Sequence, residues 1–428
     1  MAQAVFDAPA GLIIAERAGL VLRARGIPYA IAERWQRPRP APSSERAIEA
    51  RRPSNACPQL PIQRLDAALP SAFEGIAFDE DCTQLSVTRP ASEAAGLPVM
   101  VWIHGGSYEA GAADMAVFDP SAIAAEEEVI VVAVSYRLGV FGWLGGDGRP
   151  ANLGLLDLID ALRWVQRNIS AFGGNAGNVT LFGQSSGGDA IAKLMLAEPA
   201  QGLFHRAIIQ SAPLELQDRA ARMRAAMRAR MKGLGEGAST AELLAAQARI
   251  SRAARRFGLP GFMPFGPEFG AAPLPRPEAR AAAHADAAPR VDLLVGHTET
   301  EAALFLPPST GWPARMADPA RRLAVAGLTR RLYSGPARRF AEAHAAAGGR
   351  AARFVIHWGQ GAFGSAHLAE LPLLFPSEAW IGSPLVAAGT TLDTLRAEGK
   401  SLRALWAGFA RDGRIGRTVP GLVTITEG

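Results

Sequence analysis

Runs of apolar residues without polar alternation occur at strand length along the first half of the chain. Residues 98–103 and 129–134 each form such a run, and residues 179–182 form a β-branched and aromatic run. A strand that is buried on both faces has this pattern, as in parallel sheets. The sequence therefore predicts buried parallel strands at these places. Shorter strands are predicted at residues 84–89, 207–211, 291–295 and 354–356.

Helical periodicity separates these strands. Apolar residues at 155, 156, 159, 162, 165 and 169 fall on one face of a helix, which Gly173 and Gly174 end. Another apolar run follows at 191–196, and a last helix is predicted at 402–411, before a short tail. Strands that alternate with helices form βαβ units. The predicted fold class is therefore α/β, with a mostly parallel, doubly wound sheet.

Two further segments are predicted as additions to this sheet. Residues 12–25 alternate and turn at Ala18-Gly19, which predicts an N-terminal β-hairpin. Residues 215–257 are rich in alanine, arginine and methionine, and a helix there would place Met223, Met227 and Met231 on one face. Such a stripe is more often a packed helix face than the lining of a substrate pocket or a contact with lipid.

Composition places the chain among globular proteins. Of its 428 residues, 49% are hydrophobic and 20% are charged. We expect one domain over residues 1–428, with helical caps inserted around 215–285 and 306–350. No apolar run has the length of a membrane span, and the N-terminal stretch lacks a basic start and a cleavage signal. We therefore expect neither stable membrane insertion nor a secretion signal.

The net charge of +5 does not indicate a nucleic-acid partner. Of the 45 basic residues only Lys193, Lys232 and Lys400 are lysine, and the arginines are spread along the chain, often beside alanine. A nucleic-acid-binding protein would gather its basic residues in a stripe, with aromatic residues for stacking. The arginines are better explained as solvated helix faces, and we expect no nucleic acid to bind.

The chemistry of the chain is centred on Gly183-Gln184-Ser185-Ser186-Gly187, which follows one predicted strand and precedes a helix. A sharp strand-to-helix turn of this kind lifts the serine hydroxyl above the edge of the sheet. The pentapeptide alone is weak evidence, because glycine and serine are common in loops. A serine nucleophile also needs a base, a carboxylate that orients the base, and N–H donors for the oxyanion.

The expected chain order is serine, acid, histidine, so the partners are sought downstream of Ser185. His367 follows a glycine-rich segment beyond the strand at 354–356, where a base at the sheet edge belongs. His284 and His344 lie in alanine-rich helical segments and are expected to be solvated, and His357 is expected in a strand. The residues alone do not rank the possible acids, which are Glu301, Glu299 and Asp292.

An oxyanion loop is predicted at His104-Gly105-Gly106-Ser107, directly after the strand at 98–103. Glycine amides can approach a carbonyl oxygen closely because no side chain intervenes. An ordinary Gly-Gly turn is the alternative. Cys57 and Cys82 show no metal-ligand spacing, and the residues themselves allow either one disulfide or two reduced thiols.

These motifs together resemble the type-B carboxylesterases, a family of α/β-hydrolase fold that includes cholinesterases and bacterial p-nitrobenzyl esterases. The similar blocks come in the family's order. They are Arg25-Gly26-Ile27-Pro28-Tyr29-Ala30, Cys57-Pro58-Gln59, Glu80-Asp81-Cys82, Ser135-Tyr136-Arg137-Leu138-Gly139, Asn152-Leu153-Gly154-Leu155-Leu156-Asp157, Phe172-Gly173-Gly174, Val179 to Gly187, and Gly202-Leu203-Phe204-His205-Arg206-Ala207. Coverage is strong over residues 11–214 and patchy over 260–410.

The resemblance implies roles for particular residues. The segment 296–301 is similar to the family's acid block, which makes Glu301 the acid, and the segment 367–372 is similar to its histidine block, which makes His367 the base. The amides of Gly105, Gly106 and Ser186 would bind the oxyanion, and Cys57 would form a disulfide with Cys82. The chain departs from the family at Gln184, where a glutamate is usual, and at Ser186, where alanine is usual.

We therefore expect a serine hydrolase that cleaves small-molecule carboxylic esters through an acyl-enzyme, without metal or cofactor. The stretch between Glu301 and His367 is short for the family, which favours small or medium acyl groups. The alternatives are cleavage of an amide, carbamate or lactone, or a hydrolase-fold protein that only binds a partner. A monomer or weak homodimer is expected. The location would be extracellular or periplasmic if Cys57 and Cys82 are oxidised, and cytoplasmic otherwise.

Overall fold

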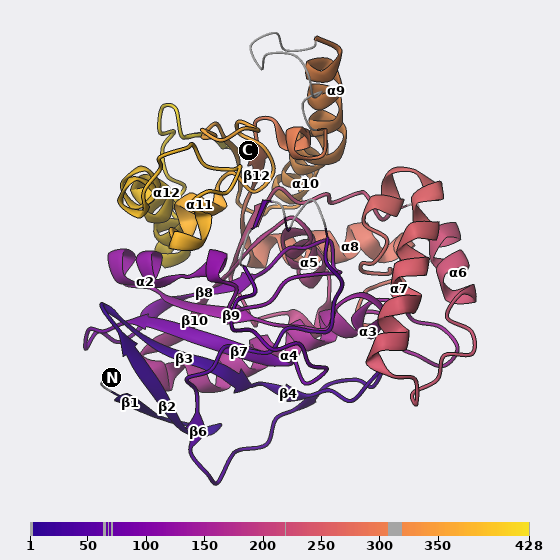
Figure 1. Cartoon of the computed structure of the whole chain (residues 1–428). Coiled ribbons are helices and arrows are strands. Elements are labelled where there is room, and N and C mark those ends of the chain that lie inside the picture. The colour runs from indigo at the N-terminus through magenta and orange to yellow at the C-terminus, as the bar shows by residue number, and fades with distance from the viewer. Residues whose placement is uncertain are drawn as a thin grey trace.

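A 12-stranded mixed sheet forms the centre of the protein (Figure 1). The structure is a computed structural model that describes residues 3–62, 66, 68–69, 72–218, 220–306 and 319–427. The strands are β1 (Gln3–Ala8), β2 (Gly11–Ala18), β3 (Val21–Pro28), β4 (Ala30–Ile31), β5 (Arg39–Pro40), β6 (Ile48–Glu49), β7 (Gln84–Pro90), β8 (Leu97–Ile103), β9 (Ile130–Val134), β10 (Gly174–Gln184), β11 (Arg206–Gln210), β12 (Asp292–Thr298), β13 (Ala351–Ile356) and β14 (Val423–Glu427).

The order across the sheet is β1-β2-β3-β7-β9-β8-β10-β11-β12-β13-β14, with β6 beside β2 and with β4 and β5 paired apart. The strands from β9 to β13 in this order are parallel, and the pairs at both ends of the sheet are antiparallel. Every residue of β8 and β9 is buried, as strands covered on both faces require. The predicted α/β class and its mostly parallel sheet are therefore confirmed.

Helices cover both faces of the sheet. The α-helices are α2 (Ser121–Glu127), α3 (Gly139–Gly142), α4 (Leu153–Asn168), α5 (Ser186–Leu194), α6 (Ala221–Ala229), α7 (Thr240–Ala254), α8 (Arg280–Ala287), α9 (Pro319–Thr329), α10 (Gly335–Ala346), α11 (Leu371–Leu374) and α12 (Leu392–Asp412). The two sheet faces bury separate clusters, because successive strand residues point to opposite sides.

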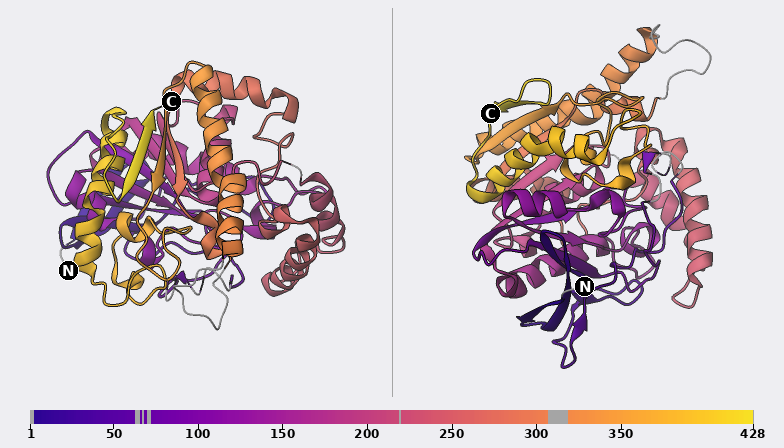
Figure 2. Two further views of the ribbon diagram at one scale, coloured as in Figure 1. Left: turned by 90° about the horizontal axis from the view of Figure 1, so that it is seen from above. Right: turned by 60° about the vertical axis from the view of Figure 1, so that its left-hand side comes forward.

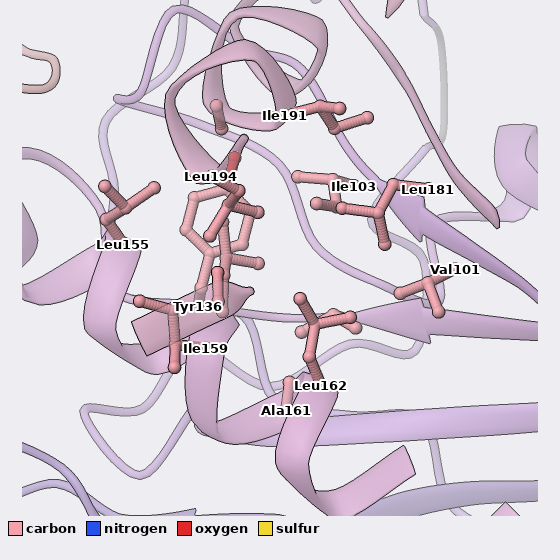
Figure 3. Close-up of a cluster of buried hydrophobic side chains, with 14 of the residues drawn as sticks. Val101, Ile103, Tyr136, Leu155, Ile159, Ala161, Leu162, Leu181, Ile191 and Leu194 are labelled. Atoms are coloured by element: carbon pink, nitrogen blue, oxygen red, sulfur yellow. The ribbon is translucent and has the colours of Figure 1, made fainter. Parts of the chain in front are cut away.

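One of these clusters lies beneath α4 and α5 (Figure 3). Val101 and Ile103 of β8 and Leu181 of β10 meet Leu162 of α4 and Ile191 of α5 there. The apolar stripe that predicted a helix at 155–172 is thus the face of α4 turned toward the sheet. On the other face, Met100 and Trp102 of β8 pack in the second cluster, beneath α2, α11 and α12.

The helices α6 and α7 lie together on the opposite side of the molecule from α12 (Figures 1 and 2). Met223, Met227 and Met231 are all buried in the first cluster, so the methionine stripe is a packed face as predicted. A capping box at Ser239 and Glu242 begins α7. Of the two predicted cap segments, residue 219 and residues 307–318 lie outside the described part of the chain.

The chain ends differ from their prediction. Strands β1 and β14 were not expected, yet β14 pairs antiparallel with β13 and closes that edge of the sheet. Strand β14 has only five residues, and so short an alternation of apolar and polar residues does not distinguish an edge strand from an irregular tail. Helix α12 begins at Leu392 rather than at residue 402. His344 is fully buried, not solvated, because α10 packs on the sheet and the His344 Nε2–H donates to the Val291 carbonyl at 2.8 Å.

The disulfide that the resemblance implied is not formed. Cys57 and Cys82 are both free and buried. The two thiols meet in a hydrogen bond instead, and this contact together with burial raises the pKa of Cys82. The Cys57 sulfur also accepts the Leu138 N–H at 3.2 Å, which ties it to the loop after β9. The pair is therefore present here as two buried, free thiols.

A buried ion pair joins the loop after β9 to α4. The guanidinium of Arg137 binds both carboxylate oxygens of Asp157, at 2.7 and 2.9 Å, and the two side chains are 3% and 0% exposed. Arg137 also donates to the carbonyls of Glu33 and Gln36, which belong to the irregular N-terminal segment. One side chain therefore holds three parts of the fold together.

We predict that Asp157→Asn lowers the free energy of unfolding by about 3–5 kcal/mol, because the buried Arg137 charge loses its counter-charge. Urea unfolding measures the change. Asp286→Asn removes the partner of Arg290 in an exposed pair and is the control, with an expected loss below about 1 kcal/mol. Equal losses in the two variants would contradict the structural role of the buried pair.

Candidate active site

Ser185 lies in the turn between β10 and α5 with φ +58° and ψ −124°. Such a conformation is costly for a residue with a side chain and persists only where the surroundings impose it. Here the Ser185 N–H donates to the Gln210 carbonyl at the end of β11, at 2.8 Å, and the Ser185 carbonyl accepts from Asp189 in α5. The turn thereby holds the serine at the carboxyl end of the parallel strands.

Two glycines allow this turn because the backbone of β8 passes very close to it. A Cβ at Gly187 would lie 2.0 Å from the Ile103 carbonyl oxygen, and one at Gly183 would lie 2.6 Å from the same oxygen. No side chain fits at either distance. The Gly-x-Ser-x-Gly spacing is therefore a packing requirement between neighbouring strands as well as a turn requirement.

A buried carboxylate and imidazole lie at the same edge of the sheet. The His367 Nδ1 is 2.5 Å from Glu301 Oε2, and the side chains are 2% and 0% exposed. Glu301 Oε1 accepts the Thr298 N–H at 2.8 Å. Burial alone would raise the pKa of Glu301, but the adjacent imidazole and its hydrogen bond outweigh burial and hold that pKa below its usual value. The pair is thus a carboxylate that orients a histidine.

The other two acids considered from the sequence lie elsewhere. Asp292 is at the amino end of β12, where Arg206 and Arg350 surround it. Glu299 is 56% exposed and faces His357. The structure therefore brings Glu301, and neither of the alternatives, to His367.

Gln184 occupies the position between the serine turn and the histidine. Its Nε2 lies 3.2 Å from His367 Nε2, and the side chain is buried. With the His367 Nδ1–H given to Glu301, the Nε2 atom is an acceptor, and the Gln184 amide can donate to it. No hydrogen bond joins Ser185 Oγ to His367 among the described residues. The imidazole nitrogen that faces the serine turn is thus occupied by Gln184.

The predicted oxyanion loop lies beside the serine turn. A Cβ at Gly105 would be 3.1 Å from the Ser185 Cβ, which shows how close the two backbones are. Within the described residues, the amides of Gly105 and Gly106 donate no hydrogen bond, so both are free to bind a carbonyl oxygen. Ser186 begins α5, where the first amides of a helix lack internal partners.

Three side chains fix this loop. His104 is fully buried, stacks on Tyr136 and donates from Nδ1 to the Gly105 carbonyl at 2.8 Å. Burial lowers the pKa of His104 to about 4, so its ring is neutral at neutral pH. Ser186 Oγ accepts the Tyr108 N–H at 3.3 Å. The hydroxyl that replaces the usual alanine therefore tethers the loop to the start of α5.

A second buried carboxyl group, Glu370, lies near the triad candidates. Its Oε1 accepts from Gln210 Nε2 at 3.2 Å, and its Oε2 has no partner among the described residues. Burial, and then the charge of Glu301, raise the pKa of Glu370 to about 7. Sequence reasoning did not assign this residue, although it follows His367 by three residues and belongs to the block quoted above.

The described residues contain no group of three His, Cys, Asp or Glu side chains that could hold a metal ion. In the same described part of the chain, each helix is too short or too polar to cross a membrane.

Comparison with known proteins gives consistent results. The sequence profile of the carboxylesterase family matches residues 16–345. A probable N-octanoylanthranilate hydrolase of Rhodococcus erythropolis is 34% identical over 95% of this chain and 93% of its own length. The para-nitrobenzyl esterase of Bacillus subtilis is 39% identical over 67% of this chain and 60% of its own. A solved thermophilic PNB esterase superposes with a TM-score of 0.82 at 28% identity, covering 99% and 97% of the two chains.

We predict that Glu370 makes stability depend on pH. Its folded-state pKa of about 7 is raised above the ordinary value of 4.5, so its contribution is full below pH 4.5 and is lost as the pH rises through 7. Relative to the parent, Glu370→Gln should therefore gain stability between these pH values, by up to about 3 kcal/mol. Asp393, 92% exposed, gives the control Asp393→Asn. A pH-independent difference in urea unfolding for Glu370→Gln would overturn this assignment.

Proposed function

Because the chain belongs to the carboxylesterase family, and is therefore a carboxylic ester hydrolase, we propose that Ser185, His367 and Glu301 form its catalytic triad. The observation that carries the proposal is the arrangement at one sheet edge. The strained serine turn and the buried His367–Glu301 pair lie there, and both touch Gln184. Small-molecule esters are the substrates. The triad rests on geometry and family resemblance together.

In the proposed reaction Ser185 Oγ attacks the acyl carbon of the ester while His367 Nε2 accepts the serine proton. Glu301 holds the Nδ1–H, which keeps Nε2 unprotonated and ready to act as the base. It also stabilises the imidazolium that forms, because the two groups are buried and in contact. Gln184 turns away from Nε2 in this step, which places the serine hydroxyl as the new partner of the imidazole.

The tetrahedral oxyanion would be held by the amides of Gly105, Gly106 and Ser186. When the intermediate collapses, the imidazolium gives its proton to the leaving alcohol and the acyl group stays on Ser185. Water then enters, gives a proton to His367 and attacks the acyl carbon. Release of the acid returns the proton to Ser185, so protons and electron pairs balance over the cycle and no cofactor is consumed.

For the substrate we propose small or medium acyl groups. The support is the short stretch between Glu301 and His367, which leaves less chain to build a deep gorge. We further propose that residues 1–428 act as one catalytic domain, with the helical segments 215–285 and 306–350 as caps. A monomer or weak homodimer without a nucleic-acid partner fits the dispersed arginines.

A second candidate function is cleavage of an acyl amide whose leaving group is an anionic aromatic amine. Two observations favour it. The relative that matches along nearly its whole length is named for N-octanoylanthranilate, a substrate of this chemistry. In addition, Gln184 is neutral where the family usually has a glutamate, so no negative charge next to Ser185 repels an anionic substrate. Hydrolysis of octanoyl esters and of N-octanoylanthranilate by one purified sample separates the two functions.

We predict that Ser185→Ala and His367→Ala each lower kcat by about 10⁴-fold or more, and that Glu301→Gln lowers it by about 10⁴-fold through the wrong tautomer. The measurement is steady-state hydrolysis of p-nitrophenyl butyrate. An organophosphonate probe should label the parent at Ser185 and leave Ser185→Ala unlabelled. Ser170→Ala, on the exposed Ser170, is the control. Full labelling of Ser185→Ala, or no labelling of the folded parent, would refute the proposed nucleophile.

We predict that Gln184→Glu moves the acid limb of the pH profile of kcat/KM upward, by about one unit, because a carboxylate beside His367 favours the protonated base. The same carboxylate should reduce kcat/KM for an ester with a free carboxylate about ten-fold more than for its neutral methyl analogue. Gln36→Glu, on an exposed glutamine, is the matched control. An unchanged profile and an unchanged substrate ratio would mean that Gln184 only fills space.

A further inference from the structure

A cavity of about 540 Å³ lies apart from the serine turn, at the β12–β13–β14 end of the sheet. Its floor is the sheet itself. Arg353 of β13 pairs in register with Val295 of β12 on one side and with Thr426 of β14 on the other, and all three line the cavity. Its wall is the π-helical segment η9 (Arg330–Ser334) and the start of α10. The left view of Figure 2 shows this helical segment running beside the strands.

The lining is strongly cationic. Five arginines contribute to it and no aspartate or glutamate does, among the residues that the structure describes; they are Arg330, Arg331, Arg338, Arg339 and Arg353. Two of the five are neutralised from outside, since Arg338 pairs with Glu342 and Arg339 pairs with Glu215.

The other three arginines of the lining have no carboxylate partner in the described residues. Arg330 and Arg331 come from one turn of η9, and Arg353 comes from the strand beneath them. Arg353 lies in the middle of β13, and its half-buried side chain lines the same cavity as these two arginines of a separate segment.

Like charges that share one concave surface raise the local electrostatic potential and attract anions. Guanidinium groups offer paired N–H donors whose geometry fits phosphate oxygens, and three such groups can share the three terminal oxygens of one phosphate. The volume of the cavity falls in the range of small-molecule sites, about 300–1,000 Å³. The volume of the cavity, the positive charge of its lining and the geometry of the guanidinium donors therefore all favour a compact phosphate-bearing ligand.

The wall of the cavity also touches the catalytic candidates. Tyr333, in the same π-helical segment as Arg330 and Arg331, is buried with its ring centre 5.4 Å from that of His367. Thr329, the residue before this segment, accepts the Ala302 N–H at 3.2 Å, directly after Glu301. Single π-helical turns inside helices are frequent at functional sites. The segment η9 thus contributes Arg330 and Arg331 to the cavity and, through Tyr333, also contacts His367.

We propose that this arginine-lined cavity binds a small phosphate-bearing molecule through Arg330, Arg331 and Arg353, and that occupancy shifts η9 and thereby alters ester hydrolysis. The bound phosphate offsets the repulsion among the three guanidinium groups, so it favours one arrangement of η9. Tyr333 moves with that segment and changes the packing of His367.

The binding test uses pyrophosphate and the full-length protein at constant ionic strength. Calorimetric titration should give a Kd at or below about 1 mM, together with a rise in melting temperature. Arg330→Gln/Arg331→Gln and, separately, Arg353→Gln should each weaken binding by about ten-fold or more. Arg249→Gln/Arg252→Gln, which removes two exposed arginines of α7, should bind as the parent does. Equal binding by all four proteins, or none by the parent, overturns the site. Tighter binding of citrate than of pyrophosphate overturns the phosphate assignment.

The coupling test measures kcat and KM for p-nitrophenyl acetate with and without saturating pyrophosphate. In the parent and in the α7 variant, kcat/KM should change by at least about two-fold. In Arg353→Gln, whose substitution lies on the sheet and outside η9, pyrophosphate should have no effect. Binding without any change in the kinetics of the parent would retain the site and overturn the coupling.

Discussion

The closeness of β8 and β10 at the Ile103 carbonyl is the constraint on which the site depends. Because a Cβ at Gly183 or Gly187 would lie within 2.6 Å of that oxygen, both positions are restricted to glycine. The same closeness brings Gly105, two residues beyond Ile103, against the Ser185 side chain. The proposed nucleophile and the proposed oxyanion loop are therefore placed by one strand pairing, whose register aligns Gly183 with Ile103. The strained φ of Ser185 is sustained by this pairing and by the hydrogen bond to Gln210.

Much of this arrangement could be predicted from the sequence because it rests on local signals. Buried strands are recognisable in the sequence as unbroken apolar runs. The two glycines of the serine turn indicate where the backbone of a neighbouring strand passes close to it. The ends of the chain gave weaker signals. β14 is short and half-exposed, so its five residues were predicted to be an irregular tail. In the structure they form the last strand of the sheet, beside β13. His344 was expected in solvent because an alanine-rich helical sequence does not show which face of α10 packs on the sheet.

The polar interior of the site could be predicted only in part. Residue patterns could not choose among Glu301, Glu299 and Asp292, since that choice depends on which side chain turns inward after β12. Nor could they reveal Gln210, whose carbonyl holds Ser185 while its side chain binds Glu370 and Trp406. Such contacts join segments far apart in the sequence and depend on side-chain direction. The disulfide was the opposite kind of error, because the sequence implied a bond that is not formed. Both cysteines of the family pattern are present, but their thiols only contact each other.

Gln184 and Glu370 show how the charge of the site is controlled. Burial first, and then the negative charge of Glu301 near the same imidazole, raise the pKa of Glu370. A third carboxylate at position 184 would add to this repulsion beside His367 Nε2, the proposed acceptor of the serine proton. An amide there avoids the added charge, yet it competes for the same imidazole nitrogen. The amide therefore lowers the negative charge around His367, and in the proposed mechanism its hydrogen bond to the imidazole must break in each cycle. The ring of Tyr333 also packs against that of His367, as does the ring of Phe305. The segment that carries Tyr333 is therefore one of the parts of the fold whose position affects the packing of this imidazole.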